Sequence, residues 1–227
     1  MRYLFNLNTT FGHRVLLRSL IRKCTEVSDN HMTPEIKLHL ITPSCSLWHS
    51  NIDKCIFVDP YWGFYWAGGQ ALSRYILDNK KIFKGKNVID IGSGSGACAI
   101  AAACCEDVTV IANDIDPVAC EVISMNSRLN NVKIHLNNEN LLLSSGLTKV
   151  DIILIGDLFY DSEFGEVLFQ WLLKCRKNYI KILIGDPGRY VLDNTKKKQL
   201  SLVKEYSLSE NIILENCGFS SAYVWQM

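Results

Sequence analysis

Apolar and polar positions alternate along the middle of the chain in two distinct patterns. Short, nearly continuous apolar runs bounded by glycine, asparagine or aspartate are typical of buried strands, and longer amphipathic stretches are typical of helices. The first pattern predicts strands at residues 86–91, 108–112, 132–136, 150–155 and 180–184. The second predicts helices between them, at residues 97–105, 117–129 and 163–175. This alternation predicts a Rossmann-like α/β fold, in which helices cover both faces of a mostly parallel sheet.

The segments on either side of this region follow other patterns. Thr33 and Pro34 are a favourable N-cap and first helical residue, so a short helix is predicted to run from there until just before Pro43. A further helix is predicted at residues 70–77. The tail of the chain contains three short extended runs, at residues 203–208, 211–217 and 220–225. We expect the tail to complete a seven-stranded sheet with an antiparallel hairpin.

The first 24 residues carry basic side chains and no acidic one. The basic residues are Arg2, Arg14, Arg18, Arg22 and Lys23. With leucines on one helical face and arginines on another, the segment resembles a mitochondrial transit peptide; the alternative is a surface amphipathic helix of the folded domain. We therefore expect residues 1–30 to be a mitochondrial targeting segment with a linker, and the mitochondrial matrix to be the location, with the cytoplasm as the alternative. Residues 31–227 are expected to form one domain with a helical and aromatic extension at 31–85.

The bulk composition argues against several classes of protein. The 227 residues include 24 Lys and Arg against 23 Asp and Glu, and this balance gives no strong field for nucleic acid. No apolar stretch reaches the roughly 20 residues that a membrane helix needs. The nine cysteines include no C-x-x-C pair and the five histidines no metal-ligand spacing. We therefore expect free thiols, no metal site, and a monomer that binds neither nucleic acid nor membrane.

The glycine-rich run at residues 92–96 is the strongest chemical signal in the sequence. It reads G-S-G-S-G and lies between a predicted strand and a predicted helix, where glycines let a ligand approach the backbone closely. Asp114 ends the next predicted strand, and its carboxylate is suited to accept hydrogen bonds from both hydroxyls of a ribose. Besides a glycine turn without a ligand, two ligand classes fit this pattern: a nicotinamide dinucleotide and S-adenosyl-L-methionine.

Spacing and charge favour S-adenosyl-L-methionine over the dinucleotide. A dinucleotide loop has its third glycine one residue later, and a carboxylate such as Asp90, just before the loop, would repel a pyrophosphate. The same carboxylate would attract a sulfonium and an ammonium group. The residues expected to bind the cofactor are Asp90, Gly92, Ser93, Gly94, Gly96, Asp114 and Ile115, and Asn138 is expected to hydrogen-bond the adenine amine.

Asp157 and Tyr160 follow the fourth predicted strand as a D-x-x-Y turn. Carboxyl ends of strands in open α/β sheets face the ligand crevice, so Asp157 could anchor a lysine ammonium and Tyr160 could orient it. In the alternative interpretation, Asp157 caps the next helix and Tyr160 packs. The aromatic segment 61–66 could line a lysine channel, cover the adenine, or belong to the core. The turn at residues 185–189 is expected at the same edge.

Several motifs resemble those of a known family. V-I-D-I-G-S-G-S-G (88–96), A-N-D-I-D-P (112–117) and G-D-L-F-Y-D (156–161) resemble the seven-strand protein lysine methyltransferases. More narrowly, D-P-Y-W-G-F-Y-W-A-G-G-Q-A-L-S-R-Y-I-L-D-N (59–79) and L-I-G-D-P-G-R (183–189) resemble the mitochondrial lysine methyltransferases of the electron-transfer flavoprotein beta subunit. The resemblance implies a class I methyltransferase fold, S-adenosyl-L-methionine as cofactor and that subunit as protein substrate. By motif, it also implies that Asp90, Gly92, Gly94 and Asp114 bind the cofactor with Trp66, Asn138 and Asp157 nearby, and that Asp157 and Tyr160 are the catalytic, substrate-side pair.

Two alternatives remain open from the sequence. The first is a methyltransferase for another acceptor, such as a ribosomal protein, an RNA or a small molecule. The absence of an N-P-P-Y motif disfavours amide or adenine acceptors, and the near-neutral charge disfavours RNA. The second is a non-catalytic assembly module that binds S-adenosyl-L-methionine.

Overall fold

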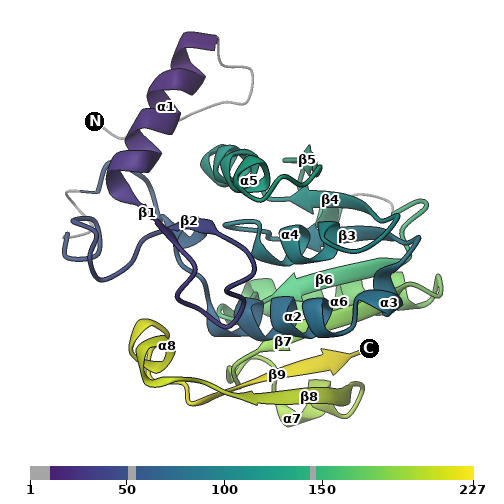
Figure 1. Ribbon diagram of the computed structural model, residues 1–227. Coiled ribbons are helices and arrows are strands. Elements are labelled where there is room, and N and C mark those ends of the chain that lie inside the picture. The colour runs from purple at the N-terminus through teal and green to yellow at the C-terminus, as the bar shows by residue number, and fades with distance from the viewer. Residues whose placement is uncertain (1–10, 51–54, 144–146) are drawn as a thin grey trace.

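A seven-stranded sheet forms the centre of the computed structural model, which describes residues 11–50, 55–143 and 147–227 (Figure 1). The strand order is β5-β4-β3-β6-β7-β9-β8. The first five of these strands are parallel, and β9 runs antiparallel to both β7 and β8. The strands are β3 (Asn87–Ile91), β4 (Thr109–Asn113), β5 (His135–Asn137), β6 (Ile152–Gly156), β7 (Lys181–Asp186), β8 (Ser201–Ser207) and β9 (Ser221–Gln226). The predicted fold class and its antiparallel closing hairpin are confirmed.

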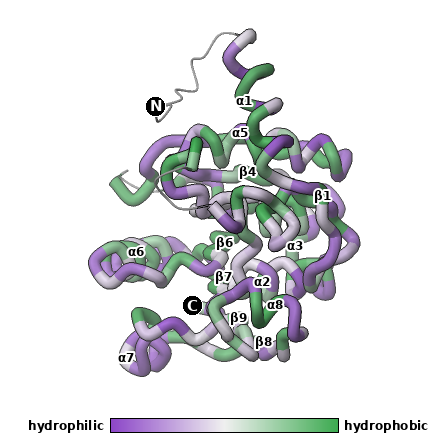
Figure 2. The backbone as a smooth tube through the Cα atoms, turned by 90° about the vertical axis from the view of Figure 1, so that its left-hand side faces the viewer, coloured by the Kyte–Doolittle hydropathy of each residue, from purple (hydrophilic) through white to green (hydrophobic). Residues whose placement is uncertain are grey.

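Helices cover both faces of the sheet, as the alternating pattern predicts. On one face α2, α4 and α5 pack against Val88, Val110 and Leu154, and on the other α6 packs against Ile89, Ile153 and Ile182, so side chains alternate between two cores. Figure 2 shows α6 and α2 on opposite sides of the sheet.

The helices are α1 (Phe11–Cys24), α2 (Ala67–Asp78), α3 (Lys80–Phe83), α4 (Ala97–Ala103), α5 (Pro117–Leu129), α6 (Ser162–Arg176), α7 (Asn194–Lys197) and α8 (Glu210–Glu215), with 3-10 turns η2 (Tyr61–Gly63) and η3 (Leu141–Leu143).

Helix α1 packs against α5 and carries Arg14, Arg18 and Arg22 of the basic N-terminal segment. Leu17 and Ile21 are buried there in a cluster with Val122. Arg18 forms an ion pair with the buried carboxylate of Glu121 on α5. This is the arrangement expected of an amphipathic helix of the folded domain. The targeting role of residues 1–30 stays a prediction, and residues 1–10 lie outside the described part of the chain.

The predicted helix between Thr33 and Pro43 is wrong. Only a turn forms at its start, where the Ile36 amide donates to the Thr33 carbonyl at 3.1 Å. The residues after it form β2 (Leu38–Leu40), which pairs antiparallel with β1 (Glu26–Ser28). The pairing of β2 with β1 therefore outweighs the helix that Thr33, as a favourable N-cap, would otherwise start.

The tail differs from its predicted pattern at one of its three runs. Residues 211–217, predicted as extended, contain α8, which buries Ile212 against the core beside α2. In an apolar run this short, the spacing of the apolar residues is compatible with a strand and equally with a helix of one or two turns. Among the described residues, no helix is long and apolar enough to cross a membrane.

Candidate functional site

The loop between β3 and α4 has the backbone geometry that its glycines allow. Gly92, Gly94 and Gly96 have φ angles of 62°, 55° and 85°, in the left-handed region. A Cβ atom on Gly92 would lie 2.7 Å from the Leu158 side chain, and one on Gly96 would lie 3.1 Å from Ile123. The loop therefore keeps its backbone close to two packed walls, which side chains at these positions would push away.

Asp90 lies directly below this loop and is buried. Its Oδ2 atom accepts hydrogen bonds from Ser93 Oγ at 2.5 Å and from the Ala99 amide at 3.1 Å, so it ties the loop to the first turns of α4. Burial raises the pKa of Asp90 to about 7, and the negative charge of Asp114 contributes to the rise. A cation placed over the loop would stabilise the ionised form of this carboxyl.

Asp114 follows β4 and faces the same loop. Its Oδ2 atom accepts from the Gly94 amide at 2.8 Å, and its Oδ1 atom accepts from the Asp116 amide at 3.0 Å. Each carboxylate oxygen can accept a further hydrogen bond, which is what the two hydroxyls of a ribose require. Burial raises the pKa of Asp114. The predicted neighbour Ile115 is 67% exposed, so it offers a free apolar surface beside this carboxylate.

The end of β5 completes this side of the site. Asn113 donates through its side-chain amide to Asn137 Oδ1 at 2.7 Å and to the Glu139 carbonyl at 2.9 Å. These bonds hold the turn that contains Asn138, whose side chain is exposed. Asp116 accepts from the Val118 amide at 2.7 Å and caps α5, as predicted.

Asp157 lies at the end of β6 in a left-handed backbone conformation, with a φ angle of 64°. Its side chain is 0% exposed and pairs with Arg189, whose Nε atom donates to Oδ1. The other oxygen, Oδ2, accepts from the Gly68 amide at the start of α2, at 2.8 Å. Burial raises the pKa of Asp157, and Arg189 opposes this rise. The alternative in which Asp157 caps α6 is wrong, because Asp161 accepts from the Phe164 amide and is the N-cap.

Aromatic rings pack against one another at the turn that follows Asp157. Tyr160 is 50% exposed and lies against Tyr61 and Phe164, at ring-centroid distances of 6.1 and 6.2 Å. Tyr61 also contacts Trp66, at 6.4 Å, and its carbonyl accepts from Trp66 Nε1 at 3.1 Å. Burial raises the pKa of Tyr160.

The aromatic segment 61–66 divides by burial. Trp62 and Tyr65 are buried in the core, whereas Tyr61, Phe64 and Trp66 are at least partly exposed, and their contact with a lysine or with adenine stays a prediction.

Arg189 is a residue of this site that the sequence pattern did not single out. Its guanidinium lies over the rings of Trp66 and Phe219, at 5.8 and 5.5 Å from their centroids. Its amide donates to Asp186 Oδ1 at 2.9 Å, in the turn that follows β7. The position of this turn after a strand end was the available signal, since such ends meet at one edge of the sheet.

Asp186 is a second buried carboxylate at this edge. Burial and the nearby charge of Asp157 raise its pKa to about 6. Its Oδ1 atom accepts two backbone hydrogen bonds, and its Oδ2 atom has no hydrogen-bond partner among the residues that the structure describes.

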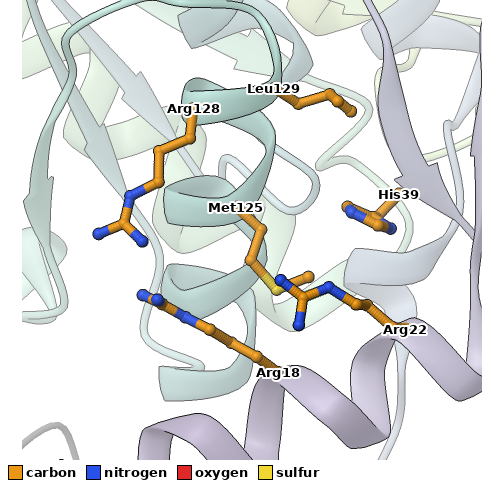
Figure 3. A pocket seen from close by; sticks show the side chains of 6 residues that line it. All are labelled: Arg18, Arg22, His39, Met125, Arg128 and Leu129. Atoms are coloured by element: carbon orange, nitrogen blue, oxygen red, sulfur yellow. The ribbon is translucent and has the colours of Figure 1, made fainter.

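A separate pocket of about 350 Å³ lies between α1 and α5 (Figure 3). Its lining residues are Arg18, Arg22, His39, Met125, Arg128 and Leu129. None of these residues belongs to the glycine loop or to the surroundings of Asp157. Among the described residues, no group of three His, Cys, Asp or Glu side chains is placed to hold a metal ion.

Comparison with known proteins adds to this geometry. A family model described as lysine methyltransferase matches residues 62–205. The electron transfer flavoprotein beta subunit lysine methyltransferase of Homo sapiens is 43% identical over 216 residues, covering 92% of this chain and 81% of that protein. The homologue from Caenorhabditis elegans is 40% identical over 225 residues, covering 89% and 92%.

Solved structures share the fold at much lower identity. The N-methyltransferase NodS from Bradyrhizobium japonicum, in complex with S-adenosyl-L-homocysteine, gives a TM-score of 0.51 at 12% identity, covering 71% of this chain and 88% of that one. P. horikoshii TYW2, in complex with MeSAdo, gives 0.52 at 16%, covering 90% and 71%. At these identities the likeness concerns the fold alone.

Proposed function

This chain belongs to the electron transfer flavoprotein beta subunit lysine methyltransferases, and we propose that it transfers methyl groups from S-adenosyl-L-methionine to lysines of that flavoprotein subunit. The observation that carries the proposal is the position of Asp157, a buried carboxylate at a strand end, with Trp66 beside its cationic partner Arg189 and Tyr160 on the turn that follows. A lysine side chain is a long apolar stem with a cationic end, so aromatic rings and a neighbouring carboxylate match both parts.

The cofactor side of the site fits S-adenosyl-L-methionine. The left-handed glycines of the β3–α4 loop leave room for a ligand against the backbone, and a Cβ atom on Gly94 would come no closer than 3.7 Å to Trp62. Asp114 would bind the ribose hydroxyls and Asp90 would favour the positive charges of the cofactor. The sulfonium supplies a methyl carbon that is open to attack by a nucleophile.

On the acceptor side, the protein's task is mainly to position the amine. The lysine must lose its proton before it attacks, and rigid alignment of amine and methyl carbon lowers the barrier. Asp157 would hold the nitrogen, Tyr160 would orient it, and the rings of Tyr61 and Trp66 would accommodate the methylated cation. Exclusion of water by these rings would strengthen the attraction between carboxylate and amine.

The proposed location is the mitochondrial matrix. The basic, acid-free stretch at the start of the chain supports import, and a fluorescent fusion of the full chain, imaged with a matrix marker, tests it. Diffuse cytoplasmic signal would reject this location.

The test of the activity is transfer of labelled methyl to purified electron-transfer flavoprotein, with mass spectrometry to locate the product. We expect methylated lysines on the beta subunit, and loss of transfer in Asp157→Ala with cofactor binding retained. Asp161→Ala is the matched control, because Asp161 lies in the same turn but only caps α6.

Each other result has a defined meaning. Transfer that survives in Asp157→Ala would reject the assigned role of this carboxylate. No transfer despite cofactor binding would reject the flavoprotein as acceptor and favour another protein or a small molecule. Cofactor binding with no acceptor of any kind would favour an assembly module.

A further inference from the structure

The guanidinium of Arg189 lies where the acceptor ammonium is expected. It is the cation that pairs with Asp157 Oδ1, and it lies over the ring of Trp66 with its Cζ atom 5.8 Å from the centroid. The ring of Phe219 is a second aromatic contact of this guanidinium, with its centroid 5.5 Å from Cζ. A carboxylate below and aromatic rings beside it are the surroundings that a lysine ammonium would seek. A side chain of the protein itself therefore fills the acceptor position.

Asp157 has no free oxygen surface while Arg189 is in place. Its side chain is 0% exposed, that of Arg189 is 18% exposed, and the second oxygen already accepts from the Gly68 amide. An incoming ammonium would meet a guanidinium of the same charge in a site that water scarcely reaches. Repulsion between like charges is strong in such surroundings, and Oδ2 is already bonded to the Gly68 amide, so the acceptor ammonium competes with the guanidinium for Oδ1.

We propose that Arg189 holds the place of the acceptor lysine in the free enzyme and that the acceptor exchanges with it on binding. The inference rests on the proposed function, because it assigns the acceptor to Asp157. The exchange replaces one cation on the buried carboxylate with another when the acceptor ammonium binds, and it closes the acceptor site when no lysine is present.

The surroundings of Arg189 permit such a movement. The Arg189 side chain is 18% exposed, and among the described residues a Cβ atom on the preceding Gly188 would make only an ordinary contact with Tyr223, at 3.8 Å, so the turn is not crowded there. The main chain of Arg189 stays held by Asp186 Oδ1. Asp186 is also a second carboxylate within electrostatic reach of the guanidinium, because the charge of Arg189 opposes the rise that burial causes in the pKa of Asp186. The side chain can therefore leave Asp157 without a large shift of its backbone.

The sharpest test is Arg189→Lys. A lysine carries its Nζ atom as many bonds from Cα as arginine carries Cζ, so the new amine would reach the acceptor position. After loss of a proton to solvent, its nitrogen would form a bond to the methyl carbon, the bond from that carbon to sulfur would break, and S-adenosyl-L-homocysteine would leave. We expect methylation at position 189 in the absence of any acceptor protein, at a first-order rate that does not depend on enzyme concentration.

A matched variant shows whether methylation of the new lysine depends on its position in the site. Arg74→Lys makes the same replacement at an arginine that pairs with Glu35 and Asp78, away from the site, and we expect no methyl group there. A cofactor-binding Arg189→Lys protein that stays unmethylated at position 189 would overturn the proposal. So would equal methylation at position 74.

A second variant removes the competing cation. In Arg189→Gln we expect the KM for the flavoprotein to fall several-fold while kcat is less affected, when both are measured on the high-pH plateau of the activity profile. Loss of Arg189 leaves burial to raise the pKa of Asp157 further, so the acid limb of the profile should move to higher pH than in the wild-type protein. A merely structural role of Arg189 would change stability but neither the acid limb nor this KM, and an unchanged KM would reject the exchange.

The wild-type protein supplies a measurement that needs no variant. Acceptor peptide added to the complex with S-adenosyl-L-homocysteine should shift the Arg189 Nε–H resonance and increase its exchange with water. An unaltered, protected signal at saturating peptide would overturn the proposal. Methylation at position 189 of the Arg189→Lys variant, without transfer to the flavoprotein by the wild type, would support the exchange and reject that acceptor. Transfer to the flavoprotein without methylation at position 189 would support that acceptor and reject the exchange.

Discussion

Gly68 and Gly185 lie so close together that neither can carry a side chain. A Cβ atom on Gly68 would lie 2.4 Å from the Gly185 carbonyl oxygen, and one on Gly185 would lie 2.0 Å from the Gly68 carbonyl oxygen. This contact presses the first turn of α2 onto β7 and places the Gly68 amide where it donates to Asp157. The packing of a helix on the sheet thus sets the position of the buried carboxylate.

Replacing Gly185 by alanine should therefore destabilise the protein strongly. Backbone atoms cannot yield as a flexible side chain can, so we expect a loss of about 3 kcal/mol or more in the free energy of unfolding. Urea denaturation followed by circular dichroism measures it. Gly12→Ala is the control, because a Cβ atom there meets no described residue within 4 Å, and it should be neutral or slightly stabilising. Similar stabilities of the two variants would show that the close contact is absent.

Asp114 and Asp116 are neighbours in one turn with separate roles, which permits a matched comparison. Asp114→Ala should weaken binding of S-adenosyl-L-homocysteine by about 10- to 100-fold, since it removes a charged acceptor for the ribose and the bond to the Gly94 amide. Asp116→Ala should cost about 1 kcal/mol of stability, because it removes the cap of α5, and should leave affinity nearly unchanged. Isothermal titration calorimetry distinguishes them, and equal affinities would refute the ribose role of Asp114.

Cofactor affinity should depend on pH through Asp90. Burial raises the pKa of Asp90 from its ordinary value of 3.8 to about 7, so between these values the folded protein binds a proton that the unfolded chain does not. The free protein therefore loses stability as pH rises through this window. A cationic ligand favours the ionised carboxyl, so affinity should fall by up to about tenfold per pH unit as pH drops below 7.

Titrations in buffers of different ionisation enthalpy would reveal the proton released on binding near pH 6. Asp90→Asn should bind more weakly above pH 7 and lose most of the pH dependence. A pH-independent affinity in the wild-type protein would contradict the assignment of Asp90.

The ion pair between Arg18 and Glu121 should anchor α1 to the domain. Arg18→Ala leaves the buried carboxylate with the longer contact to Arg14, at 3.7 Å, and should cost about 2 kcal/mol of stability. The double variant Arg18→Leu with Glu121→Leu should recover most of this loss, since it removes the unpaired charge as well. Thermal melts of the two variants measure the difference, and a single variant as stable as the wild type would show that α1 is not held by this pair.

Local sequence patterns predicted the parts of the fold that depend on interactions between residues close together in the chain. The start of α5 followed from Asp116 and Pro117, which cap and open the helix, and the glycine loop followed from its place between an apolar strand and a small-residue helix. The parallel sheet then brought Asp90 and Asp114 to one edge, because consecutive βα units place strand ends together.

Interactions between distant segments lay beyond these patterns. Residues 38–40 form a strand because β1 is available to pair with them, and no property of the segment alone indicates that partner. The pairs of Asp157 with Gly68 and Arg189 join residues 89 and 32 positions apart. The position of Asp157 after a predicted strand made it a candidate functional carboxylate, but only its tertiary surroundings show that both oxygens are occupied.

The strand order has a consequence for how the chain is made. Strand β8 has β9 as its neighbour in the sheet, yet β9 is synthesised later and inserts between β8 and β7. A growing chain, or one threaded N-terminus first through a narrow channel, must therefore carry β8 without its sheet partner and leave β7 with an open edge until residues 221–226 emerge. Open edges invite association with other chains. The last strand to appear is thus the one that joins β8 to the rest of the sheet and covers the edge of β7.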